Sequence, residues 1–239
     1  MALTKITGEG VGTLAGDTTT LTLEDTSSHS ANTGPAISFK SKDSDGTTRE
    51  VAKIVGESHS GSNEGNLAFQ TRNGGTLETK WKIFKNGNML PSNSAYGIYL
   101  GTTSVSDSNL LDDYEEGTWT PSVGGNTTYD NQIGRYVKIG NKVTLWFYIQ
   151  INQRNSPSVP YIAGSSPFTN SSSITGSGLV HYFEGINNNA VVLTARIDPG
   201  GSNINISGST GSAATVANVN HDWVKNGGDI YGFVTHYTG

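Results

Sequence analysis

Residues 110–149 read LLDDYEEGTWTPSVGGNTTYDNQIGRYVKIGNKVTLWFYI, and they contain the longest strand pattern in the chain. Gly140 and Asn141 separate two runs of β-branched and aromatic residues. This arrangement predicts two antiparallel strands joined by a two-residue turn. The stretch also divides a polar, glycine-rich front half from a more apolar back half.

The two-residue turn fixes which residues face each other across the hairpin. Lys138 is expected opposite Val143, and Tyr136 opposite Leu145. Alternation then gives one face with Tyr136, Val143, Leu145, Phe147 and Ile149, and another with Val137, Ile139, Trp146 and Tyr148. A strand with one side in water has one polar face, whereas both faces are apolar here. We expect one face in a core and the Trp146/Tyr148 face against a second chain or a ligand.

The composition favours an oligomeric β-protein. The 239 residues are 33% hydrophobic and include 31 Gly, with a net charge of only -5. The chain is therefore poor in apolar residues without having the high charge of disordered chains. Such a chain can form β-structure with many turns but buries little on its own, which favours association.

The composition also argues against several classes of protein. There is no Cys, so disulfides and thiolate metal sites are absent. We expect no secretory signal, no membrane insertion and no nucleic-acid partner, because there is no long apolar run and no basic stripe. We expect no cofactor and no metal, since the five His residues include no close ligand pair. His181 with Glu184, or His221 with Asp222, could contribute to a metal site only across a subunit axis.

The chain divides into three predicted regions. Residues 1–34, rich in glycine, are interpreted as a docking arm with one short strand at Thr20–Glu24, and a disordered tail is the alternative. Residues 35–107 alternate in short runs separated by Asp-Gly, Asn-Gly and Gly-Gly turns, which predicts a fibre-like meander with thin apolar faces. Three copies of this region around an axis could close a core that one copy cannot.

Residues 108–239 are predicted to form an antiparallel β-sandwich, jelly-roll-like. The expected later strands are Val159–Ala163, Ser173–Gly178, Leu179–Gly185, Ala190–Ile197, Asn203–Ile206 and Ile230–Tyr237. Residues 213–223 are compatible with either a helix face or a strand.

No catalytic pattern is supported by its context. The acidic residues Asp112, Asp113, Glu115 and Glu116 are interpreted as a solvated loop, because glycoside hydrolysis needs two carboxyl groups on a fixed scaffold. Asp43-Ser44-Asp45-Gly46 faintly resembles a calcium loop, but a hairpin turn explains it better. No Gly-x-Ser-x-Gly elbow is present. We expect that the protein is not an enzyme.

Two segments of residues 110–149 resemble a known module. LLDDYEEGTWTP followed by GRYVKIGNKVTLWFYI resembles a module of tail fibres and other virion proteins of tailed bacteriophages, including phages of marine cyanobacteria. In the usual form, DDYEEGTFTP precedes GRYTKIGNRV, so Trp119 replaces Phe and Lys142 replaces Arg. The opening MALTKITGEG and the front half also look like parts of such proteins, and the likeness is weak after residue 150.

The resemblance implies a homotrimeric tail fibre or spike on the virion, assembled in the host cytoplasm. It also implies that residues 108–239 act as a distal knob that binds a host surface glycan or protein. We expect the N-terminal arm to attach to other phage tail or capsid proteins, because it is rich in glycine and lacks its own core. A purely structural capsid-decoration or tail-adaptor protein is the alternative. A glycan depolymerase is disfavoured, because such enzymes use a long groove of repeated coils and no repeat of roughly 20–50 residues is present.

Aromatic side chains are the predicted binding residues, because planar rings complement the apolar C–H faces of sugars. The candidates, for a glycan or for a subunit interface, are Trp146, Tyr148, Tyr182, Trp223 and Tyr231. The polar loops at Asn152–Ser158 and Asn187–Asn189 are alternative ligand surfaces, since loops at the ends of sandwiches often bind ligands.

Overall fold

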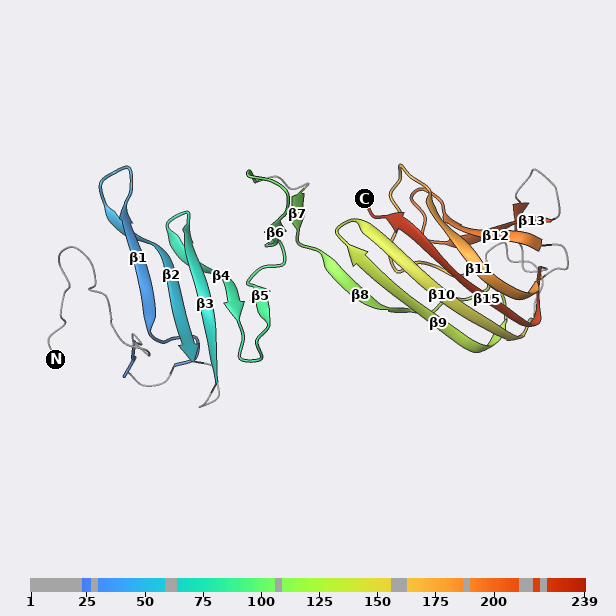
Figure 1. Cartoon of the computed structure of the whole chain (residues 1–239), viewed down its shortest axis with the longest axis horizontal. Coiled ribbons are helices and arrows are strands. Elements are labelled where there is room, and N and C mark those ends of the chain that lie inside the picture. The colour runs from blue at the N-terminus through green and yellow to red at the C-terminus, as the bar shows by residue number, and fades with distance from the viewer. Residues whose placement is uncertain are drawn as a thin grey trace, which may run out of the picture. The chain divides into compact units, whose positions relative to one another are not determined.

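The computed structural model describes residues 23–26, 30–58, 64–105, 109–155, 163–186, 190–210, 217–219 and 223–239. In these residues every regular element is a β-strand and every strand pairing is antiparallel (Figure 1), which confirms the all-β fold class. The chain forms two compact units, Met1–Tyr96 (unit 1) and Gly97–Gly239 (unit 2). The boundary predicted near Asp107 and most of the predicted arm lie outside the described residues.

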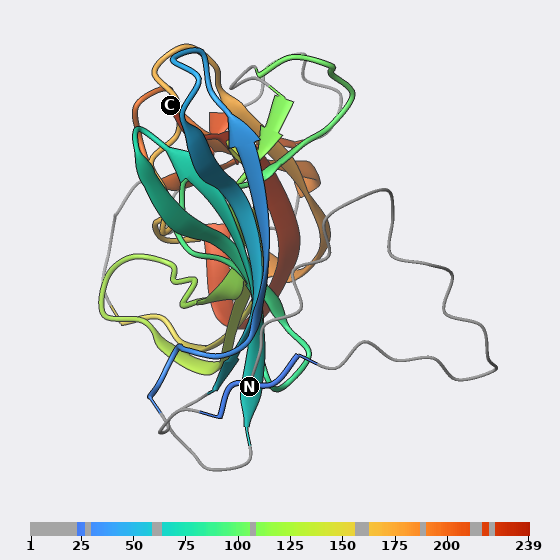
Figure 2. The ribbon, with the colours of Figure 1, turned by 90° about the vertical axis from the view of Figure 1, so that its left-hand side faces the viewer.

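Unit 1 is a meander of five strands in chain order. The strands are β1 (Ala36–Lys42), β2 (Thr48–Ser58), β3 (Gly65–Asn73), β4 (Thr76–Ile83) and β5 (Met89–Pro91). Figure 2 shows them as one twisted layer. The β1–β2 and β3–β4 connections use the Asp-Gly and Gly-Gly signals of the sequence, with φ of 82° at Gly46 and 56° at Gly74. The local turn chemistry therefore determined the meander.

The stretch that faintly resembles a calcium loop is a hairpin turn. Arg49 forms ion pairs with Asp43 and with Asp45, the second at 2.8 Å. The backbone amide of Thr47 donates a hydrogen bond of 2.8 Å to Asp45. The two carboxylates thus stabilise the turn itself.

One face of the unit 1 sheet is apolar, and the described residues of unit 1 form no second layer over it. Directly paired residues share a face, and pairing aligns one residue from each strand across the whole sheet. This row, which we call the apolar row, consists of Ile37, Ile54, Phe69, Trp81 and Pro91. Ile37 remains 44% exposed and its neighbour along β1, Phe39, 47%. The only buried apolar residues described in unit 1, Val55 and Ala68, lie on the opposite face.

Unit 2 contains one continuous eight-stranded sheet and a small two-stranded pairing. The small pairing joins β6 (Ile98–Tyr99) and β7 (Leu110–Leu111). The large sheet has the order β14-β13-β12-β11-β15-β10-β9-β8. Its strands are β8 (Tyr114–Trp119), β9 (Thr128–Ile139), β10 (Lys142–Gln153), β11 (Gly176–Ile186), β12 (Ala190–Ile197), β13 (Ile204–Thr210), β14 (Ala217–Asn218) and β15 (Val224–Tyr237).

The strand order is that of two meanders joined by β15. Strands β8 to β10 follow each other, as do β11 to β14, and β15 lies between β10 and β11. It pairs with β10 from Lys142–Tyr237 to Gln150–Asp229, and with β11 along its other edge. At Gly178 a Cβ atom would lie 1.9 Å from the carbonyl oxygen of Phe233, so β11 approaches β15 closely only because this residue is glycine.

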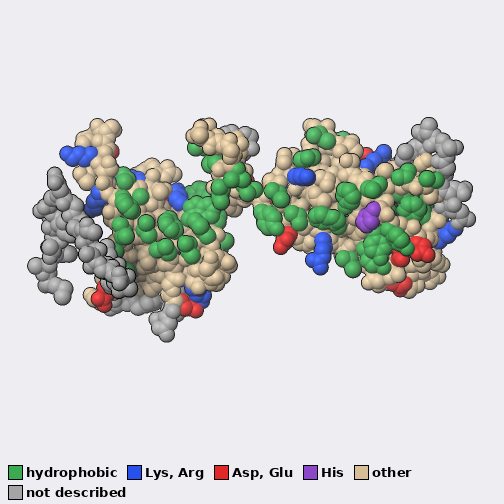
Figure 3. Space-filling view, viewed as in Figure 1, with side chains coloured by type: hydrophobic (Ala, Val, Ile, Leu, Met, Phe, Trp, Pro, Cys, Tyr) green, Lys and Arg blue, Asp and Glu red, His purple; other side chains and the backbone are tan. Residues whose placement is uncertain are grey.

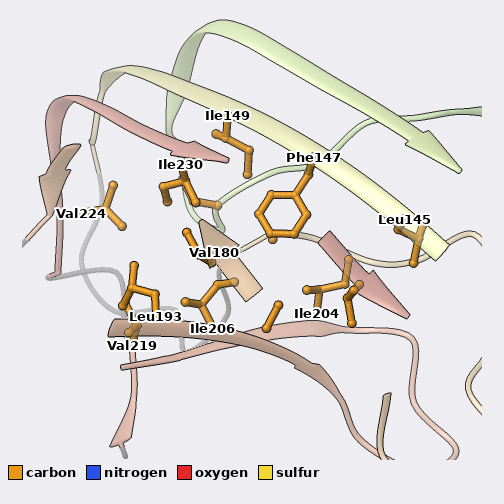
Figure 4. Packing of buried hydrophobic residues seen from close by; sticks show 14 of the residues in the cluster. Leu145, Phe147, Ile149, Val180, Leu193, Ile204, Ile206, Val219, Val224 and Ile230 are labelled. Atoms are coloured by element: carbon orange, nitrogen blue, oxygen red, sulfur yellow. The ribbon is translucent and has the colours of Figure 1, made fainter. Parts of the chain in front are cut away.

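The core of unit 2 lies inside the folded sheet. Figure 4 shows Phe147 and Ile149 on one side of the core and Ile206 on the other, so the predicted sandwich is made by one sheet that bends over itself. The jelly-roll-like arrangement stays a prediction. His236 on β15 is also fully buried, 3.1 Å from the hydroxyl of Ser166, and burial lowers its pKa.

The central hairpin has the predicted register. Val143 pairs with Lys138 and Leu145 pairs with Tyr136. Gly140 has a φ of 55°, which the turn requires. The inner face is buried as expected: Val143, Leu145, Phe147 and Ile149 are at most 3% exposed.

Three predictions about the strands need correction. The acidic residues Glu115 and Glu116 are not in a loop but in β8, which is the edge of the sheet and keeps both side chains in solvent. The two runs predicted at 173–178 and 179–185 belong to one strand, β11, which begins at Gly176 and has two register irregularities against β15. β15 begins at Val224 rather than Ile230. The strand predicted at 159–163 lies mostly outside the described residues, as do residues 213–216 and 220–222 of the ambiguous segment.

Replacing Ile230 on β15 by Ala is expected to destabilise unit 2 by about 2–5 kcal/mol, because Ile230 is 1% exposed and the surrounding core cannot fully collapse. The free energy of unfolding in urea measures the effect. The control is Ile174→Ala, since Ile174 is 54% exposed and its truncation should cost less than about 0.5 kcal/mol. Equal effects of the two changes would contradict the central place of β15.

Candidate functional site

The outward face of β9, β10, β15 and β11 is rich in aromatic residues. Register aligns Ile133, Tyr148, Tyr231 and Tyr182 in one row across these four strands. The next row contains Arg135, Trp146, Phe233 and Leu179. We call the seven uncharged residues of these rows the outer aromatic face. Figure 3 shows apolar side chains gathered over this part of unit 2.

Two of the rings cover each other and two stay open. Tyr148 and Tyr231 stack with ring centres 4.1 Å apart and an angle of 12° between the rings. Tyr182 meets Tyr231 edge to face at 5.3 Å. Trp146 and Tyr182 are 45% and 47% exposed. The open rings available for a ligand are therefore those of Trp146 and Tyr182.

Acidic and amide side chains lie beside the tyrosine row. Asp229 is paired with Gln150 on one side and with Glu184 on the other, so two carboxylates face each other across β15 and β11. Tyr182 donates a hydrogen bond of 2.9 Å to Glu184, which raises the pKa of the tyrosine. One oxygen of Asp229, Oδ1, is buried without a hydrogen-bond partner among the described residues. This end of the face is thus acidic.

The pKa of Tyr148 is raised to about 12. The largest cause is hydrogen bonding to Tyr231, followed by burial and by the negative charge of Asp229. Tyr148 therefore stays protonated and neutral at physiological pH, and the stacked pair adds no charge to the face.

The structure brings together four of the five predicted binding residues. Trp146, Tyr148, Tyr182 and Tyr231 share the outer aromatic face. Trp223 does not belong to it, because its side chain packs against the core and lies close to Gly208. Of the two loops proposed as alternative surfaces, residues 187–189 and 156–158 lie outside the described residues.

Sequence reasoning missed Arg135, Phe233, Ile133 and Leu179. Arg135 could have been found, since the register that places Tyr136 opposite Leu145 also places Arg135 opposite Trp146. Phe233 and Leu179 could not, because only the insertion of β15 brings them beside Trp146.

A groove lies where β8, β9 and β10 run side by side. Its volume is about 420 Å³, within the usual range for ligand sites of about 300–1,000 Å³. The lining residues are Glu116, Gly117, Thr118, Arg135, Tyr136, Val137 and Trp146. The groove thus joins an exposed indole to charged and hydroxyl groups at the edge of the sheet.

The described residues contain no cluster of three or more His, Asp or Glu side chains that could hold a metal ion. His181 lies in β11 beside the tyrosine row, 6.4 Å from the ring of Tyr231. His221 and Asp222 lie outside the described residues.

Comparison with protein-family models, with curated proteins and with solved structures finds no match. In the part of the chain that the structure describes, no helix has the length and apolar character needed to cross a membrane.

The raised pKa of Tyr148 makes stability depend on pH in the alkaline range. A folded-state pKa above the ordinary value of 10 contributes stability that is complete below pH 10 and is lost as the pH rises toward 12. NMR titration of ring-labelled tyrosines should show a midpoint near pH 12 that disappears in Tyr148→Phe. In Tyr231→Phe, which removes the largest cause, the Tyr148 midpoint should fall toward 10; an unchanged midpoint would disprove the assignment.

Proposed function

We propose that the chain is a structural attachment protein of a tailed-phage virion, a tail fibre or spike that assembles as a homotrimer and contacts the host surface through unit 2. The observation that carries this proposal is the apolar row of unit 1, together with the resemblance of residues 110–149 to virion-fibre modules. A single-layer sheet with an exposed apolar face gains stability when another surface covers it.

In the proposed homotrimer, other copies of the same chain cover the apolar row. Isolated surface hydrophobes are normal in monomers, but a row that crosses all five strands is contiguous. In a homotrimer each copy supplies the same row, so three thin faces together form a core of the kind that one copy lacks. In this proposal unit 1 forms the fibre and unit 2 forms the knob.

A purely structural decoration or adaptor protein is the second candidate. The same apolar row favours it equally, because oligomer formation does not require a receptor. The outer aromatic face favours attachment, since open rings beside carboxylates and amides are suited to carbohydrate recognition. The proposed protein performs no catalysis and assembles in the host cytoplasm before joining the virion.

The solution mass tests the trimer. The wild-type protein should have three times the 25.2 kDa mass of one chain in native mass spectrometry. Ile37→Lys places a charge in the apolar row and should shift the protein to monomers. Ser38→Lys is the matched control, because Ser38 is the adjacent exposed residue on the opposite face. A monomeric wild type, or equal effects of the two changes, would refute the proposal.

Adsorption experiments test attachment separately. Antibodies to the protein should label intact particles of the phage that encodes it, and soluble wild-type protein should reduce adsorption of those particles to their host. Labelling of the particles without any reduction of adsorption would favour the decoration or adaptor role instead.

A further inference from the structure

The groove beside Trp146 combines three kinds of side chain on one face. Pairing places Thr118 opposite Arg135 and Arg135 opposite Trp146, so these residues from β8, β9 and β10 form one line. Glu116 and Val137 form the neighbouring pair. Because directly paired residues point to the same side, all five side chains surround the same hollow.

Arg135 is the unusual member of this set. Its guanidinium forms no ion pair or hydrogen bond with any side chain that the structure describes, although Glu116 lies in the same groove. Glu116 instead accepts a hydrogen bond of 3.2 Å from the hydroxyl of Tyr114. The planar fork of an arginine matches a carboxylate with two parallel hydrogen bonds, so a free guanidinium beside an open indole is suited to an anionic, ring-shaped ligand.

We propose that this groove binds a sugar residue that carries a carboxylate, as in a uronic-acid polysaccharide. This inference rests on the proposed attachment function and specifies the ligand class of its binding face. The C–H face of the sugar packs on Trp146, and its carboxylate pairs with Arg135. Its hydroxyls bond to the oxygen atoms of Glu116 and Thr118.

The charges favour a carboxylate over a phosphate. One guanidinium balances the single negative charge of a carboxylate. A phosphate group carries more negative charge, so the carboxylate of Glu116 in the same groove would repel it more strongly. The position of β8 at the sheet edge leaves the groove open on one side, so a long polysaccharide can cross it.

A second copy of the chain fits this groove less well. Packing an apolar surface here would bury the guanidinium of Arg135 without a charged partner, and would bury the carboxylate of Glu116 with only the hydroxyl of Tyr114. A buried charge without an opposite charge is strongly unfavourable. The apolar row of unit 1 has no charged member and carries no such penalty.

Isothermal titration with the full chain tests the proposal. Oligogalacturonate should bind and quench tryptophan fluorescence. A neutral maltooligosaccharide of equal length and a sugar phosphate should each bind at least about tenfold more weakly. Arg135→Lys keeps the charge but loses the fork, and it should weaken oligogalacturonate binding by about tenfold or more; Trp146→Ala should do the same.

The matched control is Lys142→Gln. Lys142 lies on the same face of the same strand as Trp146, so this change removes one positive charge without touching the groove. Binding should stay within about twofold of wild type. If Lys142→Gln weakens binding as much as Arg135→Lys, the attraction is only general charge and the proposal is wrong.

Two further outcomes overturn the proposal. One is that oligogalacturonate does not bind, or binds no better than the neutral and phosphorylated sugars. The other is that no saccharide binds while Trp146→Ala lowers the solution mass, which would make the face a subunit interface.

If wild-type protein blocks phage adsorption and Arg135→Lys blocks it equally well, attachment stands and this ligand assignment fails. If wild-type protein does not block adsorption, the attachment function fails, and the titration alone decides the ligand class.

Discussion

The pairing of β15 with both β10 and β11 is the interaction on which unit 2 depends. Without it, β8–β10 and β11–β14 are two separate meanders with exposed edges. Ile230 and Val234 on β15 enter the shared core, while Tyr231 and Phe233 complete the aromatic rows on the other side. One strand therefore supports both the stability of the unit and the continuity of its outer face.

The two units differ in how far they bury their apolar side chains. Unit 2 bends one sheet until its own strands cover each other, so residues such as Leu145 and Ile206 are almost completely buried. The described part of unit 1 is a single-layer sheet, in which Ile37 and Phe39 stay 44% and 47% exposed. Most of the fully buried apolar residues that the structure describes thus lie in the core of unit 2, while the apolar row of unit 1 stays partly exposed.

Local sequence patterns predicted much of the fold because short-range chemistry determined it. Gly140 and Asn141 fixed the register of β9 and β10, and the run Ala190–Ile197 has the bounds of β12. The position of β15 could not be predicted, since nothing near Lys142 indicates that Tyr237 is its partner.

The same limit applies to the prediction of the candidate site. Arg135 was missed although the hairpin register places it opposite Trp146, whereas Phe233 depends on a pairing between distant segments. An isolated aromatic such as Trp223 does not show from sequence whether it packs against a core, as it does here.

The late position of β15 in the sequence has a consequence for biosynthesis. A ribosome makes β8 to β14 before β15, so the nascent chain holds the unpaired edges of β10 and β11 until residues 224–237 emerge. Pairing partners as distant as Lys142 and Tyr237 also imply a high contact order, which slows folding. During that interval the unpaired edges of β10 and β11 can pair with strands from other chains, which makes aggregation more favourable until β15 is made.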